Sequence, residues 1–151
     1  MLIEDSDGPL QSPNKLKYSE QYQASNVERP SLAKTVLLVD DDEDLRELIT
    51  ELLQFDGHKV EAAEDGAAAN DLLQQRTFDL ILLDWDLPGL SGPEVCKSYR
   101  SRGGESQVIL MTGMDPKIVE NAAANAGASA YLLKPFTLDK FHLSINKALN
   151  L

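Results

Sequence analysis

The sequence predicts an α/β protein, a five-stranded parallel sheet with helices on both faces. Five short apolar segments, typical of strands, alternate with five segments that carry helix signals. Such an alternation builds a parallel sheet covered on both faces, because each helix carries the chain back to the start of the next strand. The segment Leu80–Leu83 is apolar at every position, as in strands buried on both faces. We therefore expect it to be the central strand.

The first half of the predicted sheet begins after Lys34. Thr35–Val39 is a buried strand that ends at three consecutive aspartates, Asp40-Asp41-Asp42. The next segment has apolar residues at the i, i+3, i+4, i+7 and i+8 spacing of one helix face. These residues are Leu45, Leu48, Ile49, Leu52 and Leu53. Aspartates at its start cap this helix and suit its dipole, and Gly57 follows its end.

Two weaker elements lead to the central strand. His58–Ala62 is more polar than the other strands, which is typical of a strand at a sheet edge. Asp65–Arg76 is predicted to be a helix that packs through Leu72 and Leu73. After the central strand, a Pro-Gly turn is expected at Pro88.

The second half repeats the alternation. A short helix is predicted over Pro93–Arg100, with proline suited to its first turn, and a strand over Val108–Met111. An alanine-rich helix over Asp115–Asn125 stops at a glycine, and the last strand is Ala130–Leu133. Thr137 caps a final helix. The expected buried face of that helix consists of Leu138, Phe141, Ile145 and Leu149.

Composition narrows the class of protein. The 151 residues suit one domain with a tail, and no apolar run approaches the length of a membrane span. The net charge of −11 argues against nucleic acid as a partner, because no basic patch is available to replace phosphate counterions. The single cysteine, Cys96, suits a reducing cytoplasm and is expected to be a small buried residue on a helix. His58 and His142 are expected at the surface.

The chain divides by composition into two parts. Residues 1–33 hold prolines and many Ser, Gln and Asn but few aliphatic residues, so we expect a disordered tail. A short helix over Lys15–Tyr22 is the alternative. The acidic start lacks the apolar core of a signal peptide, so a cytoplasmic protein is expected. Charge is uneven in the remainder, because residues 34–111 carry 7 Lys/Arg against 17 Asp/Glu, and residues 112–151 carry 4 against 3.

Polar residues collect at the carboxyl ends of the predicted strands. These are Asp40 and Asp41, Asp84, Thr112 and Lys134. Ligands bind outside this edge of open α/β sheets. Clustered carboxylates repel one another unless a cation neutralises them, and an all-oxygen cluster suits Mg²⁺. Carboxylates, a metal ion, an ammonium and a hydroxyl around one point predict a phosphoryl-transfer site, with Asp84 as the nucleophile that forms an acyl phosphate.

The motifs closely resemble a response-regulator receiver domain over about residues 34–151. They are Val39-Asp40-Asp41, Leu83-Asp84-Trp85-Asp86-Leu87-Pro88-Gly89, Met111-Thr112-Gly113 and Tyr131-Leu132-Leu133-Lys134-Pro135-Phe136. The resemblance implies a flavodoxin-like, doubly wound sheet with strand order 2-1-3-4-5 and five helices. It also implies a cis peptide bond at Lys134-Pro135.

The resemblance implies a role for each site residue. Asp84 is the phosphoacceptor and takes phosphate from a histidine kinase or a histidine phosphotransfer protein. Asp41 and Asp84 ligate Mg²⁺ (or Mn²⁺ in its place), Asp40 holds the ion through water, and the backbone carbonyl of Asp86 is a further ligand. Lys134 and Thr112 contact the phosphoryl group.

The output of such a domain is a binding switch. The resemblance implies that Tyr131 is the aromatic switch residue, acting with Thr112. The nearly neutral segment 112–151 is the expected face for a downstream protein or for a second copy of the chain, because a partner approaches it without charge repulsion. The only chemistry expected is self-phosphorylation from phosphodonors and loss of that phosphate, so the chain is not an enzyme in the ordinary sense.

Two alternatives stay open at the sequence level. Asp84-Trp85-Asp86 also fits the DxD motif of aspartate-nucleophile phosphatases of the haloacid-dehalogenase type, which usually need a cap and a longer chain. The second alternative is a receiver cut from a longer regulator, in which an output domain would begin after Leu151.

Overall fold

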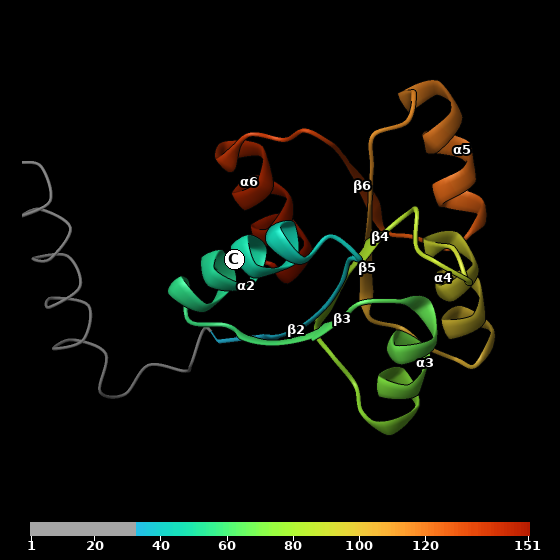
Figure 1. Ribbon diagram of the computed structural model, residues 1–151, viewed down its shortest axis with the longest axis horizontal. Coiled ribbons are helices and arrows are strands. Elements are labelled where there is room, and N and C mark those ends of the chain that lie inside the picture. The colour runs from blue at the N-terminus through green and yellow to red at the C-terminus, as the bar shows by residue number, and fades with distance from the viewer. Residues whose placement is uncertain (1–32) are drawn as a thin grey trace, which may run out of the picture. The chain divides into compact units, whose positions relative to one another are not determined.

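The computed structural model describes residues 33–151, and within this range the chain forms a doubly wound α/β sheet (Figure 1). The strands are β2 (Thr35–Val39), β3 (Lys59–Ala63), β4 (Leu80–Asp84), β5 (Gln107–Thr112) and β6 (Ala130–Leu133). The helices are α2 (Glu43–Phe55), α3 (Gly66–Gln75), α4 (Gly92–Ser101), α5 (Pro116–Asn125) and α6 (Leu138–Leu149). The expectations for the tail, including the alternative helix Lys15–Tyr22, lie outside the described residues.

All strand pairs are parallel, in the order β3-β2-β4-β5-β6. Counted along the described chain this is the order 2-1-3-4-5, which confirms the predicted flavodoxin-like topology. β4 lies at the centre and is buried at all its positions, and the more polar β3 lies at an edge. The predicted central strand and edge strand are therefore confirmed.

Two hydrophobic cores flank the sheet. One face packs against α3, α4 and α5 through residues such as Ala69, Val95 and Val119, and the other packs against α2 and α6 through Ile49, Leu53 and Phe141. Figure 1 shows the same division, with α2 and α6 to one side of the strands and α3, α4 and α5 to the other. Successive side chains of a strand enter opposite cores, which explains why these strands are apolar throughout.

Each helix begins at a side-chain cap. Asp42, Asp65, Ser91, Asp115 and Thr137 each accept a hydrogen bond from a backbone N–H of the first helical turn. The caps fix the point at which the chain leaves the carboxyl edge of the sheet. None of the helices within residues 33–151 is long and apolar enough to cross a membrane.

Three side-chain predictions are wrong. Leu48 lies at the margin of the apolar stripe of α2 and is 53% exposed, and Leu138 is the first residue of α6 and is also 53% exposed. His58 is buried rather than at the surface, because its Nδ1 accepts the backbone N–H of Lys34 at 3.1 Å beside the β2–β3 pair. Cys96 is buried in α4, as predicted.

Candidate functional site

The strand register brings the predicted site residues to one level. Val39 pairs with Leu83, so Asp40 and Asp84, the next residues, lie side by side at the carboxyl edge. Thr112 pairs with Leu133 on the other side of β4, so Lys134 follows at the same edge. The peptide bond Lys134-Pro135 is cis, as the resemblance implied.

Three carboxylates form a compact acidic cluster. Asp40, Asp41 and Asp84 each offer an oxygen atom, and these atoms all lie within 4.8 Å of one another. Asp40 is fully buried, Asp84 is 4% exposed, and Asp41 is exposed. A hard divalent ion such as Mg²⁺ takes oxygen ligands and keeps several bound waters. The cluster suits Mg²⁺ because its donors are carboxylate oxygens and because it is open to solvent at Asp41.

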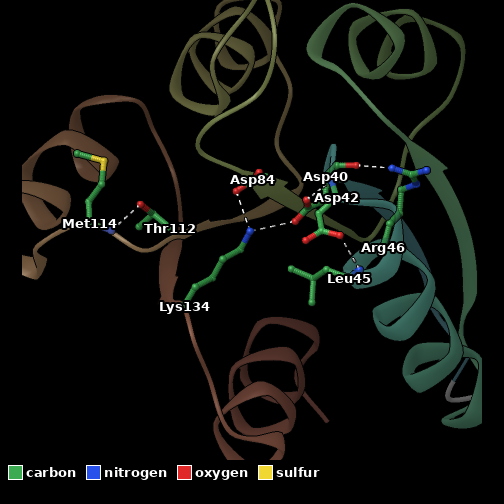
Figure 2. Close-up of polar contacts among 8 residues, drawn as sticks. All are labelled: Asp40, Asp42, Leu45, Arg46, Asp84, Thr112, Met114 and Lys134. Atoms are coloured by element: carbon green, nitrogen blue, oxygen red, sulfur yellow. Dashed lines mark hydrogen bonds and ion pairs between the residues drawn. The ribbon is translucent and has the colours of Figure 1, made fainter.

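Lys134 bridges the two buried carboxylates. Its Nζ lies 3.0 Å from Asp84 Oδ1 and 3.1 Å from Asp40 Oδ2, as Figure 2 shows. Burial by itself lowers the pKa of the Lys134 ammonium, but the hydrogen bonds and charges of Asp84 and Asp40 outweigh burial, so the net pKa is raised. One ammonium therefore stays charged among three carboxylates.

Asp84 is a carboxylate under electrostatic strain. Burial and the negative charge of Asp40 raise its pKa, the hydrogen bond from Lys134 lowers it in part, and the net pKa is about 6. An ionised Asp84 is thus costly in the metal-free protein, and a cation placed in the cluster relieves that cost.

The two predicted switch residues, Thr112 and Tyr131, lie on the neighbouring strands β5 and β6. Thr112 is buried at the end of β5, and its hydroxyl accepts a hydrogen bond from the backbone N–H of Met114 at 3.1 Å. Figure 2 shows this hydroxyl turned toward Met114. Tyr131 is half-buried on β6 and packs on the same core as Met114. Tyr131 pairs with Leu110 and Thr112 pairs with Leu133, so the two predicted switch residues lie on adjacent strands, two positions apart in register.

Asp86 stands apart from the three carboxylates. It is exposed in the loop after β4, and it is not one of the residues that form the acidic cluster. The role implied for it uses only its backbone carbonyl.

Gly92 fixes the backbone around Asp84 and was not singled out from the sequence. Its N–H donates to the carbonyl of Trp85 at 2.9 Å, and a Cβ at this position would lie 2.3 Å from the carbonyl oxygen of Asp84. Only glycine allows so close an approach. The start of α4 is thereby held directly against the end of β4.

Arg46 is a further neighbour of the cluster that the sequence did not reveal. It lies in the first turn of α2, and its Nη1 donates to the backbone carbonyl of Asp40 at 2.7 Å. Its only sequence signal is that it is the single cation close to a run of acidic residues.

A doubly wound sheet of order 2-1-3-4-5, with an acidic cluster and a lysine at its carboxyl edge, places this chain in the flavodoxin-like class of α/β proteins. Residues 36–146 match the response regulator receiver domain family, and the chain belongs to that family.

Curated relatives are themselves response regulators. The response regulators MprA of Mycobacterium sp. strain KMS and of Mycolicibacterium vanbaalenii are 40% identical to this chain over 105 residues, which is 70% of this chain and 46% of theirs. The chain thus spans about half the length of these relatives.

Solved structures that are similar to this chain are also response regulators. The Francisella response regulator 1452 receiver domain has a TM-score of 0.74 at 27% identity, over 78% of this chain and 97% of that one. Chemotaxis response regulator CheY4 of Vibrio cholerae has a TM-score of 0.71 at 28% identity, over 76% and 97%. Response regulator protein TrrA of Thermotoga maritima, solved in complex with Mg(2+)-BeF, has a TM-score of 0.69 at 32% identity, over 76% and 98%.

Proposed function

We propose that this chain is a phosphorylation-controlled switch in which Asp84 accepts a phosphoryl group. The observation that carries the proposal is the acidic cluster of Asp40, Asp41 and Asp84, bridged by Lys134 at 3.0 and 3.1 Å. The donor is a histidine kinase or a phosphotransfer protein of the cytoplasm. TrrA, which is 32% identical to this chain, was solved in complex with Mg(2+)-BeF, and this supports a magnesium ion and a phosphoryl-like group as ligands here.

Mg²⁺ would be held by Asp41 and Asp84, by Asp40 through water, and by the backbone carbonyl of Asp86. When bound, the ion neutralises the carboxylates and the charge that develops on the phosphoryl oxygens. Mn²⁺ has the same preference for oxygen ligands and would substitute for it.

Asp84 acts as the nucleophile. One of its carboxylate oxygens attacks phosphorus, the bond between phosphorus and the donor nitrogen breaks, and the donor imidazole keeps the electron pair and takes up a proton. The attacking oxygen must be unprotonated, and a pKa of about 6 leaves Asp84 mostly ionised at neutral pH. Lys134, already within 3.0 Å of Asp84, supplies the positive charge for the phosphoryl oxygens.

Output runs from Thr112 to Tyr131. Phosphate on Asp84 offers new acceptor oxygens, and the Thr112 hydroxyl turns from the Met114 N–H toward them. That movement leaves space in the core that Tyr131 shares with Met114, and the ring turns into it. We expect a two-state equilibrium with a coupling of roughly 1–3 kcal/mol.

The face that changes is the one formed by residues 112–151. This segment is nearly neutral and exposes the apolar side chains Ile118, Leu138 and Leu143. A downstream protein or a second copy of the chain is the partner that fits such a face.

Intact mass spectrometry tests the proposal. Incubation with acetyl phosphate and Mg²⁺ should add one phosphoryl group to the wild type, and chelation of the metal or the change Asp84→Asn should prevent it. Asp86→Asn removes an equal charge nearby and is the matched control, which should still be phosphorylated. Phosphoryl gain that persists in Asp84→Asn refutes the assignment.

The phosphatase alternative is not favoured by the family match. Steady hydrolysis of p-nitrophenyl phosphate, lost in both Asp84→Asn and Asp86→Asn, would restore that alternative. We expect no turnover of this ester.

A further inference from the structure

Arg46 contacts the backbone of the acidic cluster rather than a carboxylate. It lies one turn into α2, where its own N–H donates to the carbonyl of Asp42 at 2.9 Å. Its guanidinium extends back toward β2, and Nη1 reaches the carbonyl oxygen of Asp40 at 2.7 Å (Figure 2). A hydrogen bond from a charged donor at this distance is among the stronger kinds in proteins.

The carbonyl that Arg46 holds belongs to the peptide group between Asp40 and Asp41. The orientation of this peptide group decides the direction in which the Asp41 side chain leaves the backbone. Asp40 is fixed independently, because Oδ1 accepts the N–H of Asp42 at 2.9 Å and Oδ2 contacts Lys134. Asp41 is exposed, so the peptide group before it is where its position is set.

The charge of Arg46 acts in the opposite direction. A guanidinium close to the acidic cluster repels a divalent cation, so electrostatics alone would make Mg²⁺ bind more tightly when the charge is removed. Loss of the hydrogen bond to Asp40 would make Mg²⁺ bind more weakly, because Asp41 would no longer be held in place. The two effects have opposite signs, and a binding experiment separates them.

We propose that Arg46 is a positioning residue for the divalent-ion site, and that it acts by holding the Asp40–Asp41 peptide group through the Asp40 carbonyl. This inference rests on the proposed function, since it assumes that Asp41 ligates Mg²⁺. Removing a residue that orients a metal ligand typically lowers metal affinity by about 10–100-fold.

The experiment is a Mg²⁺ titration of the full chain, followed by Trp85 fluorescence and by calorimetry. The variants are Arg46→Met, which removes charge and donor, and Arg46→Lys, which keeps both in a more flexible form. Arg102→Met is the matched control. Arg102 is exposed at the end of α4, where its Nη1 donates a hydrogen bond to the Ser98 hydroxyl and not to the acidic cluster. We expect about tenfold weaker binding in Arg46→Met. Arg46→Lys should fall between that variant and the wild type, and Arg102→Met should match the wild type.

A second readout needs no metal. In ¹H–¹⁵N spectra of the metal-free protein, the Asp41 amide should shift in Arg46→Met and stay in place in Arg102→Met. Each variant is also unfolded in urea, so that a purely structural role is detected. If Arg46→Met loses stability but binds Mg²⁺ as tightly as the wild type, or more tightly, the inference is overturned. If the wild type itself binds no Mg²⁺, the proposed function has failed instead.

Discussion

Replacing Asp84 with asparagine should make the metal-free protein more stable. The Asp84 carboxylate is buried beside Asp40 and Asp41, and burial together with these negative charges raises its pKa from 3.8 to about 6 in spite of the hydrogen bond from Lys134. Its charge therefore disfavours the folded state at neutral pH. Asparagine has the same shape and no charge, and its side-chain oxygen can still accept the hydrogen bond that Lys134 donates.

The size of this effect follows from the pKa. A shift from 3.8 to about 6 is roughly two pKa units. Each unit corresponds to about 1.4 kcal/mol of free energy difference between the two protonation states. The upper limit is therefore about 3 kcal/mol, and we expect about 1–3 kcal/mol because the wild-type site can relax around the charge.

The dependence on pH identifies the cause. The pKa of Asp84 is higher in the folded state than the unfolded value of 3.8, so the protonated carboxyl contributes stability that is fully present below pH 3.8. This contribution is lost as the pH rises through about 6, where the folded protein loses the proton. The advantage of Asp84→Asn over the wild type should therefore grow from about pH 4 to about pH 6 and stay level above that. Urea unfolding in the presence of a chelator, followed by circular dichroism at several pH values, measures it.

A matched control separates burial from net charge. Asp86→Asn removes the same charge from an exposed position two residues away, and it should change the free energy of unfolding by less than about 0.5 kcal/mol. Saturating Mg²⁺ should raise the stability of the wild type more than that of Asp84→Asn. If Asp84→Asn is no more stable than the wild type at pH 7.5 without metal, the argument from buried charge is refuted.

Three further predictions concern other residues. Asp41→Ala should abolish the Mg²⁺-dependent change in Trp85 fluorescence and raise metal-free stability by about 0.5–1 kcal/mol in urea unfolding; a wild-type titration curve would contradict this. Burial lowers the pKa of His58 below 6.5, so the neutral imidazole contributes stability above that pH, and this contribution is lost as the pH falls below it. In the Asp84→Asn background, His58→Gln should therefore flatten the pH dependence of the unfolding free energy below about pH 6.5. An unchanged slope would refute this prediction. Thr112→Ala should still take up phosphate, but beryllofluoride should no longer alter amide exchange across residues 112–149, whereas protection changes equal to those of the wild type would exclude Thr112 as the link.

The fold followed from the sequence because its signals are local. A run such as Leu80–Leu83, apolar on both strand faces, has few alternatives to a central strand, and the helix caps fixed the ends of the elements. Predicted and observed bounds differ by one or two residues, as for β3, which begins at Lys59 instead of His58. The strand order, however, came from the resemblance, because the alternation of strands and helices is compatible with several orders.

The candidate site was predictable for a similar reason. Parallel strands place their carboxyl ends at one edge, so Asp40 and Asp84 lie side by side after the adjacent strands β2 and β4. Lys134 follows β6, which is separated from β4 by β5, and its long side chain reaches across to both carboxylates. In the structure, Lys134 Nζ lies 3.0 Å from Asp84 Oδ1 and 3.1 Å from Asp40 Oδ2. Their roles in metal binding and phosphorylation stay predictions.

Some residues were not predicted from the sequence, because their surroundings depend on contacts between elements distant in the sequence or on the direction of a side chain. Gly92 matters because a Cβ at this position would clash with the Asp84 carbonyl, and His58 is buried where the backbone N–H of Lys34, just before β2, bonds to its ring. Arg46 has the periodicity of an ordinary polar helix residue, and nothing in the pattern shows that it turns toward Asp40. Leu48 and Leu138 have the spacing of core residues, but they lie where no partner element covers them fully.

The most direct test of the central claim is to locate the phosphoryl group. Wild-type protein is incubated with acetyl phosphate and Mg²⁺, digested, and its peptides are mapped by mass spectrometry. The account predicts a single modified residue, Asp84, in the presence of Mg²⁺ and no modification when the metal is chelated. Phosphate on Asp40, Asp41 or Asp86 of the wild type, or no phosphate under these conditions, would contradict it.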